Sequence, residues 1–130
     1  TLNYEAVKNL TDKIYLVDTI EDLENMENNL SKVSTIIEGI FGTGLDRTIS
    51  GTYAYVIAVI NRSMKYIISI DIPSGLDSTS GDSWGEVVDS DLIVSMQLMK
   101  KGVYERSSYK SKCIVEDIGI PQKAIDYIID

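Results

Sequence analysis

Residues 66–77 have the sequence YIISIDIPSGLD, an apolar run that ends in a carboxylate and a turn. An unbroken apolar strand is typical of a parallel sheet that is covered on both faces. Asp71 comes at the end of the run, where burying a carboxylate without a partner is costly. Pro73 fixes the following turn, and Ser74 adds a hydroxyl. The stretch therefore predicts a strand over 66–72 that ends in either a chemically active carboxylate or an Asx-type turn.

A second apolar run ends in a loop that contains two glycines. Thr35 to Phe41 predicts a strand, and the loop GTGLDR at 42–47 leads to a helix start near Thr52. Glycines permit positive φ and let a ligand approach without a Cβ in the way. Open parallel sheets bind ligands at the carboxyl ends of neighbouring strands, and amides at a helix start attract anions. The loop therefore predicts an anion site beside Asp71, with a tight turn and a surface Arg47 as the alternative.

Three other charged residues can be interpreted either as part of a functional site or as ordinary solvated side chains. Glu38 interrupts the apolar run of its strand, so it needs a partner or a cation if buried, or else it is a solvated edge residue. Lys100 and Lys101 follow a predicted strand, where one of them is positioned to approach a ligand or both form a solvated pair.

The remaining periodicity predicts helices and strands in alternation. Helices are expected at 4–10, 19–30, 52–61 and 122–129, and further strands at 14–17, 91–96 and 113–118. This alternation predicts an α/β fold with a parallel sheet.

Composition excludes several classes of function. The 130 residues make one domain or part of one, and the net charge of −8 disfavours nucleic acid and anionic membranes. No apolar run approaches the roughly 20 residues that span a bilayer. The absence of histidine rules out Ser-His-Asp and Cys-His catalysis and histidine-ligated metals, and a single cysteine fits a reducing cytoplasm.

Several motifs in order resemble the YjeF N-terminal domain family, the NAD(P)H-hydrate epimerases. They are FGTGLDR at 41–47, SIDIPSGLD at 69–77, KKG at 100–102 and VEDIGIP at 115–121. The resemblance covers essentially all of 1–130, which it identifies as a partial domain of this family. Either loop alone would be weak evidence, whereas the ordered combination is specific.

The resemblance implies a Rossmann-like three-layer sandwich with a mostly parallel sheet. It also implies a cytoplasmic metabolite-repair enzyme that interconverts the R and S epimers of hydrated NADH and NADPH. A fused ADP- or ATP-dependent dehydratase domain and a homo-oligomeric state are left open. The alternative is a non-catalytic nucleotide-binding or scaffold module of the same fold.

The resemblance also implies roles for individual residues. Asp71 matches the catalytic acid/base and a substrate contact, and the implied potassium ligands are Ser74 and Glu38, where the family usually has aspartate. The implied substrate-binding loop comprises Gly42, Thr43, Gly44, Leu45, Asp46, Arg47 and Thr48.

One part of the family pattern has no counterpart in these 130 residues. The Asn-Asn-Gly-Gly-Asp-Gly loop and the first two strands of the family domain would lie upstream of Thr1. In the strand order 3-2-1-4-5, Ile14–Val17 and Thr35–Phe41 would then not be neighbours. The sequence therefore predicts an exposed edge on the 35–41 strand and a natural protein that is longer at its N-terminus.

Overall fold

The computed structural model describes residues 2–129, and for residues 128 and 129 the backbone alone. The chain divides into two compact units, 1–32 and 33–130. The first unit contains helices α1 (Leu2–Lys8) and α2 (Ile20–Ser31), and neither helix has a buried residue. Thr19 begins α2 with a capping box, because its side chain accepts from the Asp22 amide and Asp22 bonds back to the Thr19 amide.

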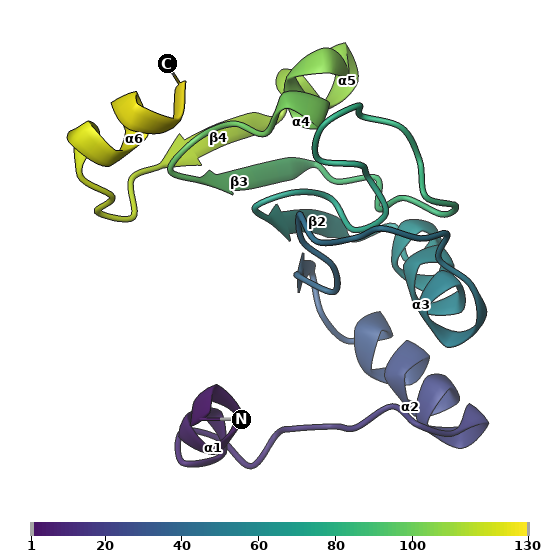
Figure 1. Cartoon of the computed structure of the whole chain (residues 1–130). Coiled ribbons are helices and arrows are strands. Elements are labelled where there is room, and N and C mark those ends of the chain that lie inside the picture. The colour runs from purple at the N-terminus through teal and green to yellow at the C-terminus, as the bar shows by residue number, and fades with distance from the viewer. Residues whose placement is uncertain (1, 130) are drawn as a thin grey trace. The chain divides into compact units, whose positions relative to one another are not determined.

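A four-stranded sheet forms the centre of the second unit (Figure 1). Its strands are β1 (Thr35–Glu38), β2 (Tyr66–Ile70), β3 (Leu92–Met96) and β4 (Cys113–Glu116), in the order β1-β2-β3-β4. All three neighbouring pairs are parallel, which confirms the α/β class predicted from the sequence.

Helices connect and follow these strands. Helix α3 (Gly51–Arg62) joins β1 to β2, and α6 (Gln122–Ile129) follows β4. Two short helices, α4 (Lys101–Glu105) and α5 (Ser107–Lys110), lie between β3 and β4 and were not predicted. They span five and four residues, too few to repeat an apolar periodicity, and no side chain caps their N-termini.

The strand predictions differ from the structure in two ways. The apolar run at 14–17 is not a strand, so that prediction is wrong, and no ladder in the described chain joins it to β1. An extended segment without a partner has no ladder hydrogen bonds to make it a strand. The strands predicted at 35–41, 66–72 and 113–118 end earlier, at Glu38, Ile70 and Glu116. Strand β1 lies at the edge of the sheet, as the strand order predicted.

The sheet is covered unequally on its two faces. Ile36, Ile67 and Ile93 are buried on one face, at most 7% exposed. Ile93 belongs to a core cluster with Ile72, Leu76, Val103 and Tyr109. On the other face several large apolar side chains are exposed: Ile37, Tyr66, Ile70, Met96 and Ile114. None of the helices within the described residues is long and apolar enough to cross a membrane.

Candidate functional site

Strand β2 ends in a tight turn centred on Asp71. Asp71 has φ +70°, and the Ile72 amide donates to the Ile70 carbonyl at 2.9 Å, which makes a three-residue γ-turn. The Asp71 amide still donates to Val94 on β3 at 2.8 Å. A side chain in this backbone region costs on the order of 1–3 kcal/mol and persists where its surroundings fix it, often at functional sites.

The Asp71 carboxylate is held by one of its two oxygens. Oδ1 accepts from the Met96 amide at 2.9 Å and from the Lys100 ammonium, which also donates to the Met96 carbonyl at 3.0 Å. The Lys100 and Asp71 side chains are 19% and 14% exposed. Lys100 is therefore not part of a solvated pair, and Asp71 does not form an Asx turn with the amides that follow it. No hydrogen bond within the described part of the chain reaches Oδ2.

A second γ-turn follows β3 and was not predicted. Gln97 has φ +62°, and the Leu98 amide donates to the Met96 carbonyl at 2.7 Å. The Gln97 side-chain oxygen accepts from the amides of Ile118 and Ile120 at 3.0 and 3.3 Å. These hydrogen bonds hold the loop after β4 at the carboxyl ends of the strands, where Asp71 also lies.

Glu38 and Ser74 contact one another in the interior, near the carboxyl ends of the strands. Glu38 is 3% exposed, which excludes the alternative of a solvated edge residue. Its Oε2 accepts from the Ser74 hydroxyl at 2.6 Å and the Ile40 amide at 3.3 Å. Its Oε1 accepts from the Ser74 amide at 3.1 Å and from the Ser69 hydroxyl. The two predicted cation ligands are thus in direct contact.

The oxygen atoms around Glu38 fit a monovalent cation. Ser74 Oγ lies 2.6 Å from Glu38 Oε2 and 3.3 Å from the Phe41 carbonyl oxygen, so carboxylate, hydroxyl and carbonyl oxygens gather here. All the donors to Glu38 within the described residues are neutral, so an ionised Glu38 would carry a buried charge that a cation would balance. No cluster of three or more acidic, cysteine or histidine residues occurs among residues 2–129. A single carboxylate among neutral oxygens suits a singly charged ion such as potassium.

The loop at 42–48 borders a cavity of about 250 Å³. Leu45, Arg47 and Thr48 line it together with Tyr53 of α3, whose ring centroid lies 4.9 Å from that of Phe41. Thr43 and Asp46 are exposed and lie outside the lining.

The glycines of this loop differ from the prediction in their backbone angles. Gly42 and Gly44 do not have positive φ, so that part of the prediction is wrong. Positive φ occurs instead at Gly51, the first residue of α3, at +60°. A Cβ added at Gly42 or Gly44 would meet no atom within 4 Å. Neither backbone geometry nor internal packing requires glycine at 42 and 44, whereas close approach of a ligand would.

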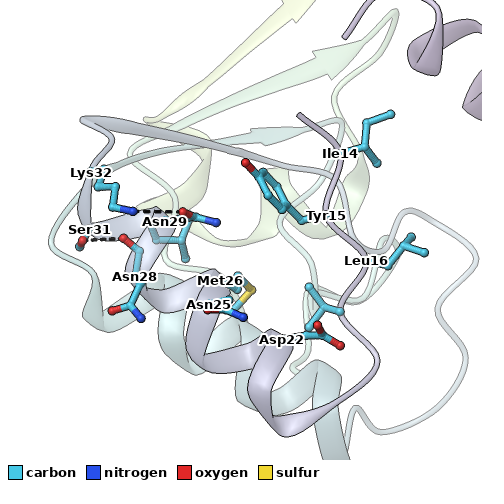
Figure 2. A pocket seen from close by; sticks show the side chains of 12 residues that line it. Ile14, Tyr15, Leu16, Asp22, Asn25, Met26, Asn28, Asn29, Ser31 and Lys32 are labelled. Atoms are coloured by element: carbon cyan, nitrogen blue, oxygen red, sulfur yellow. Dashed lines mark hydrogen bonds between the residues drawn. The ribbon is translucent and has the colours of Figure 1, made fainter. Parts of the chain in front are cut away.

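The first unit contains a larger cavity, which Figure 2 shows from close by. Its volume is about 1010 Å³, and it lies between the segment 14–17 and helix α2. In Figure 2, Tyr15 and Leu16 come from the extended segment, whereas Asn25 and Met26 come from the helix. None of the predicted site residues lines it.

A protein-family model agrees with the motifs at this site. The model described as YjeF-related protein N-terminus matches residues 1–102. The chain belongs to this family. It is 66% identical over 128 residues to the NAD(P)H-hydrate epimerase of Anaerococcus prevotii, a match that covers 98% of this chain and 59% of the relative.

More distant family relatives include longer proteins. The chain is 36% identical to the bifunctional NAD(P)H-hydrate repair enzyme Nnr of Dictyoglomus turgidum, over 85% of this chain and 22% of that one. The crystal structure of the yeast protein ynu0 (YNL200c) aligns with a TM-score of 0.64 at 20% identity, over 78% of this chain and 43% of that one. This last likeness shows a shared fold.

Proposed function

We propose that the intact protein interconverts the R and S epimers of hydrated NADH and NADPH. The observation that carries the proposal is the hydrogen bonding of the Asp71 side chain. Its Oδ1 accepts from Met96 and Lys100, while its Oδ2 has no partner among the described residues. The 66% identical relative that is named NAD(P)H-hydrate epimerase supports this reaction. A small-molecule substrate and a cytoplasmic location are part of the same proposal, which leaves the oligomeric state open.

The proposed reaction uses Asp71 as both acid and base. Epimerisation requires the hydroxyl on the hydrated ring carbon to leave and a water to return on the other face. The reaction starts with Asp71 protonated on Oδ2, while Oδ1 accepts from the Met96 amide and Lys100. Oδ2 gives this proton to the departing hydroxyl, and the C–O bond breaks as the ring nitrogen supplies its electron pair. Water then adds to the opposite face, and its proton returns to Asp71. Lys100 acts as a positioning residue, because it holds Oδ1 and leaves Oδ2 directed at the substrate.

The proposed substrate contacts come from the loop 42–48. Arg47 carries the positive charge in the lining of the cavity beside Tyr53 and would pair with a phosphate of the nucleotide. Gly42 and Gly44 leave open space beside the loop backbone, where the substrate would approach.

A potassium ion held by Glu38 and Ser74 belongs to the same proposal. When bound, it would supply a positive charge that offsets substrate phosphate and balances the buried carboxylate. Ser74 also joins the two loops, because its hydroxyl oxygen accepts from the Phe41 amide at 2.9 Å. These residues therefore connect the ion to the start of the substrate-binding loop.

Neutralising Asp71 in the intact protein tests the proposal. Asp71→Asn keeps an oxygen that accepts from the Met96 amide but removes the group that exchanges a proton, so epimer exchange should slow by about 10²–10⁴-fold. Exchange between the two hydrate epimers is followed by NMR against the spontaneous rate. Asp89→Asn is the matched control, because Asp89 is exposed and contacts Lys112.

Two results would contradict this assignment in different ways. Wild-type exchange in Asp71→Asn would remove Asp71 from the reaction. Wild-type protein that binds a nicotinamide nucleotide without accelerating exchange would instead favour a non-catalytic module. A dehydratase reaction in the intact protein would add a second activity, in keeping with the word "bifunctional" in the name of the Dictyoglomus relative.

A further inference from the structure

Two buried serines continue the hydrogen-bond network of Glu38 within the sheet. Ser69 lies on β2 and Ser90 directly before Asp91 and β3, and both are 0% exposed. The Ser69 hydroxyl donates to Glu38 Oε1, and the hydroxyl oxygens of Ser69 and Ser90 are 2.5 Å apart. The mechanism proposed above uses neither serine.

Counting hydroxyl protons fixes the direction of this chain of hydrogen bonds. Each serine has one proton to donate and two lone pairs to accept with. Ser69 gives its proton to Glu38, so the bond between the serines requires Ser90 to donate to Ser69. The chain therefore runs from Ser90 through Ser69 to Glu38, and successive bonds of this kind strengthen one another.

The surroundings of the two Glu38 oxygens differ. Oε1 is bound by Ser69 from the interior of β2 and by the Ser74 amide. Oε2 accepts from the Ile40 amide at 3.3 Å and from the Ser74 hydroxyl, whose oxygen also lies 3.3 Å from the Phe41 carbonyl oxygen. That carbonyl offers the Ser74 proton a second acceptor, so Oε2 can be released to an ion while Oε1 stays held.

We propose that Ser69 is a positioning residue for the cation site, holding Glu38 by Oε1 so that Oε2 faces the ion. This inference rests on the proposed potassium site. Without Ser69, Oε1 keeps only the Ser74 amide at 3.1 Å, so the Glu38 carboxylate is held less firmly when the Ser74 hydroxyl turns to Phe41. A cation site with one poorly held ligand binds more weakly and distinguishes less well between ions of different size.

The test is a potassium titration of the intact protein, followed by its melting temperature. Choline chloride replaces potassium chloride at constant ionic strength, and sodium is titrated in parallel. In Ser69→Ala the apparent potassium affinity should fall about tenfold, the size of one net hydrogen bond to a charged group, with a smaller preference for potassium over sodium. Ser69→Cys keeps a side chain of similar size but has a weaker donor. If the alanine variant does not fold, the cysteine variant should show the same direction of change, a lower apparent potassium affinity.

Ser95→Ala is the matched control. Ser95 is also 0% exposed and its hydroxyl donates to the carbonyls of Asp71 and Leu98, not to Glu38. It should lower the melting temperature in choline without changing potassium affinity. If the wild type responds to potassium and the Ser69 variants respond equally, Ser69 has no such role, whereas a wild type without any response refutes the potassium site itself. Epimer exchange, measured separately, reports on the reaction independently of both outcomes.

Discussion

At the scale of single residues, the glycines separate into two physical kinds. Gly75 has φ +98°, and a Cβ there would lie 2.1 Å from the Glu86 carbonyl oxygen. Gly44 does not have a positive φ, and a Cβ added there would meet no atom within 4 Å. Gly75 is therefore required by the fold, whereas Gly44 is required only if a ligand approaches the loop.

This contrast predicts opposite phenotypes for two identical substitutions. Gly75→Ala should destabilise the protein by more than about 3 kcal/mol, because both the backbone angle and the space are incompatible with a side chain. Gly44→Ala should change stability by less than about 1 kcal/mol but raise the KM for hydrated NADPH. Melting temperatures and steady-state kinetics separate the two effects. An unchanged KM in Gly44→Ala would argue against the loop as the substrate contact.

Asp71 was predicted from its own neighbourhood, but its partner was not. A carboxylate at the end of an apolar run is visible in the sequence, whereas Lys100 lies 29 residues away. Glu38 and Ser69 are likewise 31 residues apart. Such pairs depend on the parallel register of β1, β2 and β3, which local periodicity does not encode.

At the scale of elements, the loop after β2 is built around Asp77. Its Oδ1 accepts from the amides of Thr79 and Ser80 at 2.8 and 2.7 Å, and its Oδ2 accepts from Trp84 Nε1 at 3.0 Å. Gly102 of α4 approaches so closely that a Cβ there would lie 2.0 Å from the Asp77 carbonyl oxygen. Hydrogen bonds to Asp77 and close contact with α4 therefore define the conformation of this loop.

The stability of this loop should depend on pH. Hydrogen bonds from the Ser80 and Thr79 amides and from Trp84 lower the pKa of Asp77 from 3.8 to about 2. Because the folded value is the lower one, Asp77 stabilises the fold above about pH 4 and loses that contribution as pH falls toward 2. Asp77→Asn should therefore melt at a lower temperature at pH 7, and its difference from the wild type should shrink between pH 4 and 2.

Thermal melts that are monitored by Trp84 fluorescence measure this difference. Asp82→Asn is a suitable control, since the Asp82 side chain is exposed and makes no described hydrogen bond. A difference between Asp77→Asn and the wild type that stays constant down to pH 2 would contradict the role given to the Asp77 carboxylate.

The γ-turn at Asp71 ends β2 earlier than the apolar pattern suggests, whereas β3 ends at Met96 as predicted. Ile72 continues the apolar run but lies beyond the turn at Asp71, where it is 0% exposed and joins the core cluster. The sequence predicted a strand to 72 because hydrophobicity reports burial, and burial continues after the strand has ended.

At the scale of the whole molecule, β1 presents both an unpaired edge and exposed apolar side chains. Ile37 is 67% exposed on this strand, and Ile70 is 46% exposed on the same face of β2. Open strand edges are templates for pairing with another chain. A protein of these 130 residues should therefore self-associate, and Ile37→Lys should shift it toward monomer.

Sedimentation velocity over a range of protein concentrations checks this expectation. The conservative variant Ile37→Val keeps the edge apolar and should associate like the wild type. A wild type that remains monomeric at every concentration would show that the edge is protected in solution.

The sequence alone determined the alternation of strands and helices, the α/β class, and the positions of Asp71 and of the loop after β1. These features follow from local properties, namely apolar periodicity, turn residues and chain direction. Only the tertiary structure decided that Lys100 fixes Asp71, that the hydroxyls of Ser69 and Ser74 bind different oxygens of Glu38, and that residues 14–17 form no strand. Each of these depends on which strands lie side by side and in what register, because hydrogen bonds between distant residues form only after the sheet has brought them together.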